Sequence, residues 1–311
     1  MSSAASEPRT KVPGRRIDGV LLLDKPPGLT SNHALQRVKR LYRAAKAGHA
    51  GSLDPLATGM LPICFGSATS ICAYLLDSRK SYRVTACLGV ATDTGDADGT
   101  AIERSDAPAP DEPRVATALR GFEGPIEQVP PMYSALKRDG VPLYRLARRG
   151  IEVPRAARRV LIEAIALEGY RWPELRFAVR CSKGTYVRTL VTDLAAALGT
   201  VGHVRELRRL EVEPFREDGM ITLAVLEERA REAGSEALDG LLLPPDAALS
   251  GWPTVQLDKT AAVRLGHGQA VPADAAWPLG RVRVYVEPHE FVAIGEVTAQ
   301  RRLVPRRVFA R

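Results

Sequence analysis

The longest uncharged stretch of the chain limits the folds that it can adopt. Residues 55–76, PLATGMLPICFGSATSICAYLL, contain no charged side chain and are therefore expected to be buried, in a protein core or in a bilayer. The stretch is long enough to cross a bilayer, but Pro55, Gly59, Pro62 and Gly66 interrupt it. We expect a buried loop, a core strand and the start of a helix, and no membrane span.

A lone carboxylate, Asp54, stands directly before this stretch in the sequence GHAGSLDPLATG. The simplest interpretation is a tight Asp-Pro turn, because Asp hydrogen-bonds its own backbone and Pro fixes φ. A carboxylate among glycines and apolar residues is nevertheless costly unless a partner compensates its charge. The alternative is a nucleophile or an acid–base group in a site that excludes water, with a cation that keeps it ionised.

A candidate partner for Asp54 lies in residues 181–194, CSKGTYVRTLVTDL, which we expect to form the corner between a strand and a helix. Tyr186 and Arg188 are two residues apart across this corner, so their side chains can converge on one pocket. On spacing alone, a half-buried core aromatic and a surface charge are the simpler interpretations of these two residues.

The composition favours a polyanionic partner and a reducing compartment. The 311 residues are enough for two domains, and 44 Lys and Arg against 36 Asp and Glu give a net charge of +8. The four cysteines form no C-x-x-C pair and have no histidine at metal-ligand spacing, so we expect neither disulfides nor a metal site. We expect a cytoplasmic protein, and residues 1–17, which lack an apolar signal region, are typical of a disordered tail.

Apolar patterns along the chain predict an α+β fold with a mixed, largely antiparallel sheet flanked by helices. Short or alternating apolar runs indicate strands at residues 19–28, 80–92, 160–171, 174–181 and 203–215. Helical patterns begin near Thr30 and cover residues 186–198 and 221–232. Residues 241–253, LLLPPDAALSGWP, indicate a linker, and the alternating pattern beyond it indicates a small β-rich domain.

The aspartates of residues 93–100, DTGDADGT, suggest a calcium loop at first sight. An EF-hand register needs acidic residues at Thr94 and Ser105, so it fails at both ends. We interpret the segment as a hairpin turn closed by Asp98-Gly99.

Residues 125–159 are unusually basic. From Lys137 to Arg159 there are eight Lys or Arg and two acidic residues, and Tyr133 and Tyr144 are interleaved. Such a segment can follow a phosphate backbone and offer rings on which bases stack, whereas the alternative is a solvated amphipathic helix. The candidate contacts to an RNA backbone are Lys137, Arg138, Arg145, Arg148 and Arg149.

Seven sequence blocks together resemble one enzyme family. The blocks LLLDKPPGLTSN, GHAGSLDPLATGMLPICFG, KSYRV, DTGDADG, VPPMYSALKRDGVPLY, GTYVRTL and HVRELRRL occur in the order and spacing of the TruB family of tRNA pseudouridine synthases. The resemblance implies a pseudouridine synthase catalytic domain over residues 18–250. It also implies that residues 125–159 are an inserted RNA-clasping loop and that residues 251–311 are a PUA-like RNA-binding domain.

The resemblance assigns roles to individual residues. It implies three catalytic residues: Asp54 is the catalytic aspartate, Tyr82 stacks on the flipped uracil and takes part in proton removal, and Arg188 pairs with the aspartate. It further implies a pocket in which Tyr186 is a second tyrosine, Leu207 is an apolar wall and His49 contacts RNA near the extruded base. Lys25, in LDKP, is expected to be a structural support.

The activity implied by the resemblance is that of a tRNA pseudouridine(55) synthase. Such an enzyme flips the T-loop uridine out of its stack and exchanges a C–N for a C–C glycosidic bond, without a cofactor or metal. We expect a monomer that binds the T stem-loop of tRNA and needs no protein partner or membrane. The alternatives are an RNA-guided rRNA pseudouridine synthase and a non-catalytic T-arm-binding protein that helps tRNA to fold. Attack of Asp54 on ribose C1′, attack on uracil C6 and assistance of 2′-deprotonation all remain open.

Overall fold

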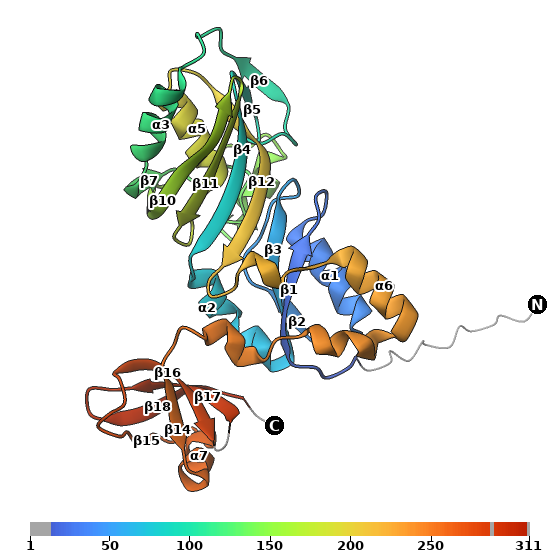
Figure 1. The fold of residues 1–311 in the computed structure, drawn as a ribbon, viewed down its shortest axis with the longest axis vertical. Helices are drawn as coiled ribbons and strands as arrows, with labels where there is room; N and C mark the ends of the chain where they lie inside the picture. The colour runs from blue at the N-terminus through green and yellow to red at the C-terminus, as the bar shows by residue number, and fades with distance from the viewer. Residues whose placement is uncertain (1–13, 287–288, 310–311) are drawn as a thin grey trace, which may run out of the picture.

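The computed structural model describes residues 14–286 and 289–309, which contain two large sheets (Figure 1). The larger sheet has the strand order β13–β1–β3–β12–β4–β11–β10–β7, and β2 also pairs with β3. Among these strands only the β1–β13 and β3–β12 pairs are parallel, which confirms a mixed, largely antiparallel sheet. Its strands are β1 (Gly19–Lys25), β2 (Ala47–His49), β3 (Thr58–Phe65), β4 (Lys80–Leu88), β7 (Gly124–Gln128), β10 (Arg158–Arg171), β11 (Glu174–Cys181), β12 (Gly202–Val212) and β13 (Ile221–Thr222).

Strand β1 lies at the centre of the first half of this sheet. Val20 and Leu22 pack into a core on one face, and Leu21 and Leu23 pack into a second core on the other face. Successive side chains of a strand point to opposite faces, so the unbroken apolar run of β1 requires cover on both sides. That cover comes from η1 (Gly66–Ile71) and α2 (Cys72–Asp77) on one side, and from α1 (Ser31–Leu41) and α6 (Leu223–Ala233) on the other.

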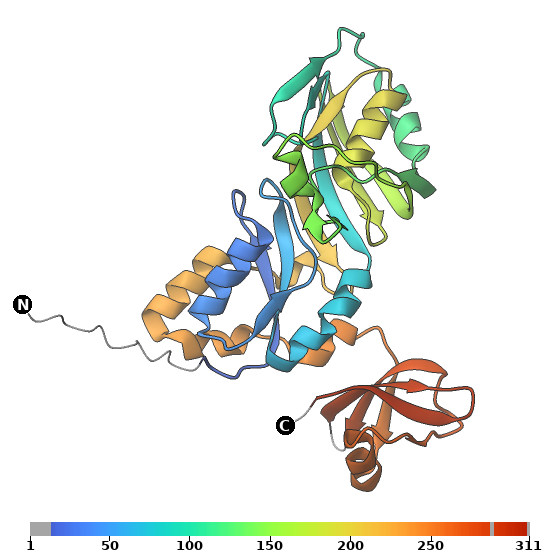
Figure 2. The ribbon, with the colours of Figure 1, turned by 180° about the vertical axis from the view of Figure 1, so that it is seen from behind.

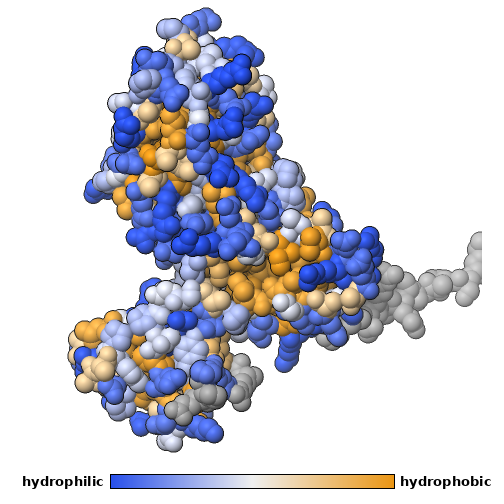
Figure 3. All heavy atoms as spheres, viewed as in Figure 1, coloured by the Kyte–Doolittle hydropathy of each residue, from blue (hydrophilic) through white to orange (hydrophobic). Residues whose placement is uncertain are grey.

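The second half of the sheet is covered on one face only. Leu175, Phe177 and Val179 of β11 point into a core beneath two helices, which lie toward the viewer in Figure 2. The opposite face carries ion pairs such as Arg83–Glu168 at 3.1 Å, and Figure 3 shows hydrophilic residues over it. One buried and one solvated face produce the alternating pattern of these strands. The other elements of this half are α3 (Glu112–Arg120), α5 (Val187–Ala197) and the hairpin of β5 (Val90–Thr92) and β6 (Ala101–Arg104).

The two halves meet where β3 lies beside β12. These strands share two register pairs, Thr58 with Arg208 and Gly59 with Arg209. Gly59 has a φ of 96°, and a Cβ at this position would lie 2.2 Å from the backbone oxygen of Arg209. Only glycine allows both the conformation and the close approach. Gly59 therefore allows the two halves to join.

The C-terminal residues form a separate five-stranded sheet, which confirms the expected β-rich domain. Val282 and Val284 are buried in its core, whereas Arg283 between them is half-buried. This is the alternation that the sequence indicated. The elements are β14 (Thr254–Leu257), α7 (Lys259–Gly266), β15 (Val271–Pro272), β16 (Gly280–Val286), β17 (Glu290–Val297) and β18 (Arg302–Val308).

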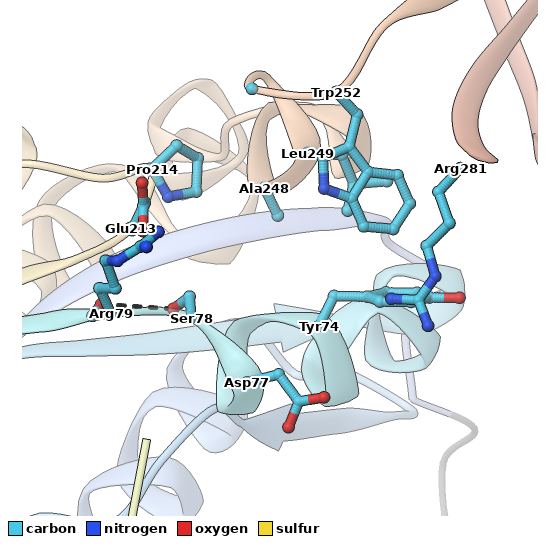
Figure 4. A pocket seen from close by; sticks show the side chains of 11 residues that line it. Tyr74, Asp77, Ser78, Arg79, Glu213, Pro214, Ala248, Leu249, Trp252 and Arg281 are labelled. Carbon is cyan, nitrogen blue, oxygen red and sulfur yellow. Dashed lines mark hydrogen bonds and ion pairs between the residues drawn. The ribbon is translucent and has the colours of Figure 1, made fainter. Parts of the chain in front are cut away.

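An aromatic cluster joins this small sheet to the larger domain (Figure 4). The guanidinium carbon of Arg281 lies 5.2 Å from the ring centre of Tyr74 and 5.6 Å from that of Trp252. The two rings meet edge to face with 5.0 Å between their centres. A pocket of about 320 Å³ opens beside them.

The uncharged stretch at residues 55–76 folds as expected. It forms the loop after Asp54, then β3, η1 and the beginning of α2. Within the part of the chain that the structure describes, no helix is long and apolar enough to cross a membrane. Residues 80–92, expected as one strand, form β4 and β5, because Gly89 adopts a φ of 84° between them.

The N-terminal segment differs in part from the expected tail. Residues 1–13 lie outside the described residues. Arg15 is held in place, because its backbone pairs with that of Ala44 and its side chain forms an ion pair of 2.5 Å with Asp239.

The expected loop at residues 125–159 begins and ends inside the sheet. Its first residues belong to β7, whose Gln128 pairs with Arg158 at the start of β10. Residues 129–157, called the basic segment from here on, lie between these strands. They contain the small hairpin of β8 (Lys137–Arg138) and β9 (Val141–Pro142) and the short helix α4 (Leu143–Ala147).

The expected linker at residues 241–253 is packed against the larger domain. Val20 and Leu243 exchange two backbone hydrogen bonds of 2.8 and 2.9 Å, and Ala248 and Leu249 are buried. The prolines start a 3₁₀ turn here, since Pro suits the first positions of a helical turn. The turns involved are η3 (Ser235–Leu241) and η4 (Pro245–Leu249); the remaining short turn of the described chain is η2 (Glu217–Gly219).

We predict that Gly59→Ala lowers the free energy of unfolding by about 2 kcal/mol or more, because the new methyl group meets backbone and φ is unfavourable. The matched control is Gly169→Ala, in β10, where a Cβ would meet nothing within 4 Å. Urea unfolding of both variants measures the difference. Equal stability of the two variants would contradict the role given to Gly59.

Candidate active site

Asp54 lies in the loop between β2 and β3, and hydrogen bonds hold this loop on both sides of it. The Ser31 hydroxyl accepts from the backbone N–H of Leu53 at 2.7 Å and donates to its carbonyl at 3.0 Å. The N–H of Ala57 donates to the carbonyl of Asp54 at 3.1 Å, so the segment does form a tight turn. The turn and the carboxylate are therefore compatible features of one loop.

The Asp54 carboxylate pairs with Arg188 through two nitrogens. Nη2 of Arg188 donates to Oδ1 at 3.1 Å, and Nε lies 2.9 Å from Oδ2. Arg188 is 6% exposed, whereas the Asp54 side chain is 38% exposed, so the aspartate keeps a face open to solvent. Arg188 stands in the first turn of α5, two residues after Tyr186 at its N-cap.

Arg188 also binds two further segments of the chain. Its Nη1 donates to the carbonyl of Thr94 at 2.8 Å, and its Nη2 donates to the carbonyl of Tyr133 at 2.7 Å. The N–H donors of this one guanidinium therefore bind the Asp54 loop, the turn after β5 and the basic segment.

Asp96 is a second carboxylate at Arg188 and was not among the residues predicted for the site. Its Oδ2 lies 3.6 Å from Nε of Arg188, and its Oδ1 accepts from the Thr94 hydroxyl at 2.6 Å. Asp96 is buried, whereas Asp98 in the same turn is exposed. A hairpin turn does not need three aspartates, so their number in this short segment was the one sequence feature that could have indicated a functional carboxylate here.

The electrostatics of Asp54 result from opposing effects. Burial raises the pKa of Asp54 above its ordinary value, and the Arg188 guanidinium opposes this rise. The negative charge of Asp96 raises the pKa of Asp54 further, and the Lys25 ammonium lowers it.

A cavity of about 610 Å³ opens above the Asp54–Arg188 pair. Residues of α1, of the Asp54 loop and of the turn after β5 form one part of its wall. The basic segment supplies the other part, with Tyr133, Tyr144 and Arg148 among its residues. The Arg148 guanidinium lies 5.7 Å from the ring centre of Tyr144. An aromatic and cationic wall facing a carboxylate suits a nucleotide, because rings stack on bases and cations attract phosphate.

Three predicted pocket residues do not line this cavity. Leu207 is buried in the same apolar cluster as Leu53, and half-buried Tyr82 packs against that cluster. They therefore lie on the inner side of the Asp54 loop. Tyr186 is held through its backbone, since the amide of Gln128 accepts from its N–H at 3.0 Å and donates to its carbonyl at 3.3 Å.

His49 does line the cavity, at the end of β2. Its Nδ1 is buried and has no hydrogen-bond partner in the described chain. Burial and the positive charge of Arg209 lower the pKa of His49, so a neutral imidazole faces the cavity at pH 7.

Lys25 supports the Asp54 loop from below. Its ammonium donates to the carbonyls of Pro26 at 2.8 Å, Leu29 at 2.7 Å and Pro55 at 3.3 Å. Burial lowers the pKa of Lys25 to about 8. These contacts agree with the structural role expected of Lys25.

The residues of the basic segment that were predicted to contact an RNA backbone are all exposed. No carboxylate of the described residues forms an ion pair with Lys137, Arg145, Arg148 or Arg149, whereas Arg138 lies 3.9 Å from Asp139. The four unpaired cations are therefore available to a polyanion. Among all the residues that the structure describes, no three His, Cys, Asp or Glu residues are grouped closely enough to hold a metal ion.

Family models match the chain in three consecutive parts. The TruB family pseudouridylate synthase N-terminal domain matches residues 39–187, the tRNA pseudouridylate synthase B C-terminal domain matches residues 188–250, and the pseudouridine synthase II TruB C-terminal model matches residues 253–309.

Relatives and solved structures agree with these models. The tRNA pseudouridine synthase B of Ectopseudomonas mendocina (strain ymp) is 51% identical over 94% of this chain and 96% of its own length. That of Pseudomonas aeruginosa (strain UCBPP-PA14) is 50% identical with the same coverage. A chain in the crystal structure of a Cbf5–Nop10–Gar1 complex is 28% identical over 94% of this chain and 85% of that chain, with a TM-score of 0.72. An H/ACA RNP bound to a substrate RNA containing 2′-deoxyuridine gives 26% identity and a TM-score of 0.71, at the same coverage.

The chain has the architecture of a pseudouridine synthase, which is an isomerase. The sheet is mixed and built in two halves, and a buried arginine holds a carboxylate where the halves meet. The chain belongs to the TruB family, as the resemblance of its sequence blocks implied.

We predict that Asp96→Asn lowers the pKa of Asp54. The amide keeps an oxygen for the Thr94 hydroxyl but removes the negative charge that raises the pKa. A ¹³C NMR titration of labelled aspartate carboxylates measures the shift. Asp98→Asn, an exposed neighbour, is the control and should leave the pKa of Asp54 in place. An unchanged or higher pKa in Asp96→Asn would show that Asp96 does not act on Asp54 through its charge.

Proposed function

We propose that this tRNA pseudouridine synthase modifies the uridine at position 55, in the T loop of tRNA, and that Asp54 is its catalytic carboxylate. The observation that carries the proposal is the two-point pairing of a partly exposed aspartate with a buried arginine at a nucleotide-sized cavity. Pairing with the guanidinium favours the ionised carboxylate and orients it, and the open face of Asp54 leaves it accessible to a substrate.

The isomerisation needs no exchange of material with a second substrate. The bond between ribose C1′ and uracil N1 breaks, the ring turns, and a bond forms between C1′ and C5. The proton on C5 leaves and N1 gains a proton, so atoms and electrons balance. Asp54 reacts with the nucleotide, and Arg188 holds the carboxylate in its charged form and in a fixed orientation.

The neighbouring residues of the pocket would receive the flipped base. A base must leave its stack before it can turn, which costs a few kcal/mol. Stacking on an aromatic ring such as Tyr82 returns about 1–3 kcal/mol per base. Tyr82, Leu207 and Tyr186 do not line the cavity, so we propose that they meet the base beneath the Asp54 loop, whereas the neutral imidazole of His49 would contact RNA at the mouth of the cavity.

The basic segment would close on the RNA. Its Arg148 lines the cavity, its other candidate cations are exposed, and Tyr133 links it to the active site through Arg188. We propose that it clasps the T stem-loop by phosphate contacts and shape.

A requirement for protein partners separates this proposal from an RNA-guided synthase. We propose that the chain acts alone, as a monomer, on tRNA, in line with relatives that are named as tRNA enzymes and are about half identical over nearly the whole chain. Purified protein with an unmodified tRNA transcript and no other macromolecule tests this. Product at the T-loop uridine supports the proposal, and product only after addition of a guide RNA and partners overturns it.

We predict that Asp54→Asn slows pseudouridine formation by about a thousand-fold or more, because the amide of the new asparagine side chain cannot act as a nucleophile. The affinity for tRNA should stay within a few-fold, because phosphate contacts dominate binding. Single-turnover assays and filter binding measure the two quantities, with Asp106→Asn, an exposed aspartate outside the lining of the cavity, as the control. Rapid turnover by Asp54→Asn would refute its catalytic role. Tight tRNA binding by the wild type without any product would instead favour a non-catalytic tRNA-binding protein.

We predict that changing Arg145, Arg148 and Arg149 together to Gln weakens tRNA binding and lowers its salt dependence. Each lost phosphate contact reduces the slope of log K against log salt by about 1. The control changes three exposed arginines outside the basic segment, Arg216, Arg229 and Arg231, to Gln. If both triple variants give the same affinity and slope, the basic segment is not the clasp.

A further inference from the structure

Arg209 is the largest fully buried side chain of the described structure, with 1% exposure. It lies on β12, next to Leu207 and Arg208 in the sequence RELRRL. Its neighbour Arg208 forms an ion pair of 2.8 Å with Asp24 at a half-buried position. Arg209, in contrast, forms no ion pair with any carboxylate among residues 14–286 and 289–309.

The Arg209 guanidinium binds backbone carbonyls. Its Nε donates to the carbonyl of Met60 at 2.7 Å, Nη2 to that of Gly51 at 3.0 Å, and Nη1 to that of Ser52 at 3.4 Å. Gly51 and Ser52 precede Asp54, and Met60 follows it. One planar group therefore joins the two ends of the loop that carries the carboxylate.

The backbone of Arg209 is fixed by two neighbouring strands. It pairs with Gly59 on β3 and with Tyr82 on β4. The close approach at Gly59 leaves no room for a side chain between this backbone and the loop end. Arg209 thus connects the Asp54 loop to the strand that carries Tyr82.

A buried charge without an anion is unfavourable unless dipoles solvate it. Burying an apolar side chain at this position would avoid that cost, so the arginine has to provide something that packing cannot. Two carbonyls before Asp54 and one in β3 after it, held at three points of a rigid fork, are a geometric constraint that no apolar side chain supplies.

We infer that Arg209 is a positioning residue for the isomerisation: its guanidinium fixes the Asp54 loop relative to Arg188 and Tyr82, and so determines the rate of reaction rather than the affinity for RNA. The inference rests on the proposed role of Asp54 as the catalytic carboxylate. Displacement of a reacting group by a fraction of an ångström to 1 Å is sufficient to slow catalysis strongly.

Lys80 provides a matched comparison, because it is also a buried cation without a bound anion. Its ammonium donates to the carbonyls of Leu75, Leu76 and Ser78 at 2.9, 2.8 and 2.6 Å, and these belong to the end of α2. Removal of either cation should destabilise the fold, but only Arg209 binds the Asp54 loop.

The experiment compares Arg209→Lys, Arg209→Met and Lys80→Met with the wild type and with Asp54→Asn. We would measure thermal unfolding, tRNA affinity and the single-turnover rate with saturating enzyme, well below the melting temperature of every variant. We expect Arg209→Met and Arg209→Lys to react at least about ten-fold more slowly with affinity within about three-fold. A lysine ammonium also has three donors but lacks the rigid planar fork of the guanidinium, so it should not hold the two ends of the loop in the same positions, and lysine should not restore the rate. Lys80→Met should unfold earlier but react within about two-fold of the wild type.

The inference is overturned if Arg209→Lys reacts like the wild type, or if Lys80→Met loses as much rate as Arg209→Met at equal stability. It is also overturned if the affinity falls while the rate is unchanged. Should Arg209→Met fail to fold, the rate of Arg209→Lys decides. Failure of the proposed function appears separately, as activity of Asp54→Asn, and does not depend on the Arg209 variants.

Discussion

The guanidinium of Arg188 is the interaction on which the organisation of the active site depends. It binds Asp54, the carbonyls of Thr94 and Tyr133, and the edge of Asp96, so one side chain brings together parts of the chain that are distant in sequence. The group is nearly buried, so its charge is poorly screened and its removal would leave two carboxylates facing each other. Electrostatics and positioning in the site therefore have the same origin.

The sheet explains why this convergence is possible at one place. Its two halves have different packing, one covered on both faces and the other on one face, and they join over two register pairs of β3 and β12. A full-length ladder between these strands would leave no gap at which loops from both halves could meet. The short junction leaves room for the Asp54 loop, while Arg209 and Lys25 hold that loop from inside the protein.

The sequence predicted the regular elements well, because alternation in β11 or the apolar run of β1 directly reflects which faces are covered. Asp54 and Arg188 were identified through family blocks, since spacing alone favoured an ordinary turn and a surface charge. Asp96 and Arg209 were not found, because their burial depends on strands paired far along the chain. Residues 241–253 looked like a linker because prolines mark chain breaks locally, whereas the hydrogen bonds to Val20 are set by tertiary structure.

The strand order has a consequence for synthesis on the ribosome. β12 fills the place between β3 and β4, yet it is translated after both of them and after β11. Until β12 emerges, one edge of β4 and the Thr58 end of β3, beyond its pairing with β2, have no partner strand, and unpaired edges template aggregation. The two halves can form beforehand as separate units, β1 with β3 and β4 with β11, and insertion of the late strand then joins them. A nascent chain that stops before β12 would therefore be exposed to chaperones as two incomplete sheets rather than as one folded enzyme lacking its end.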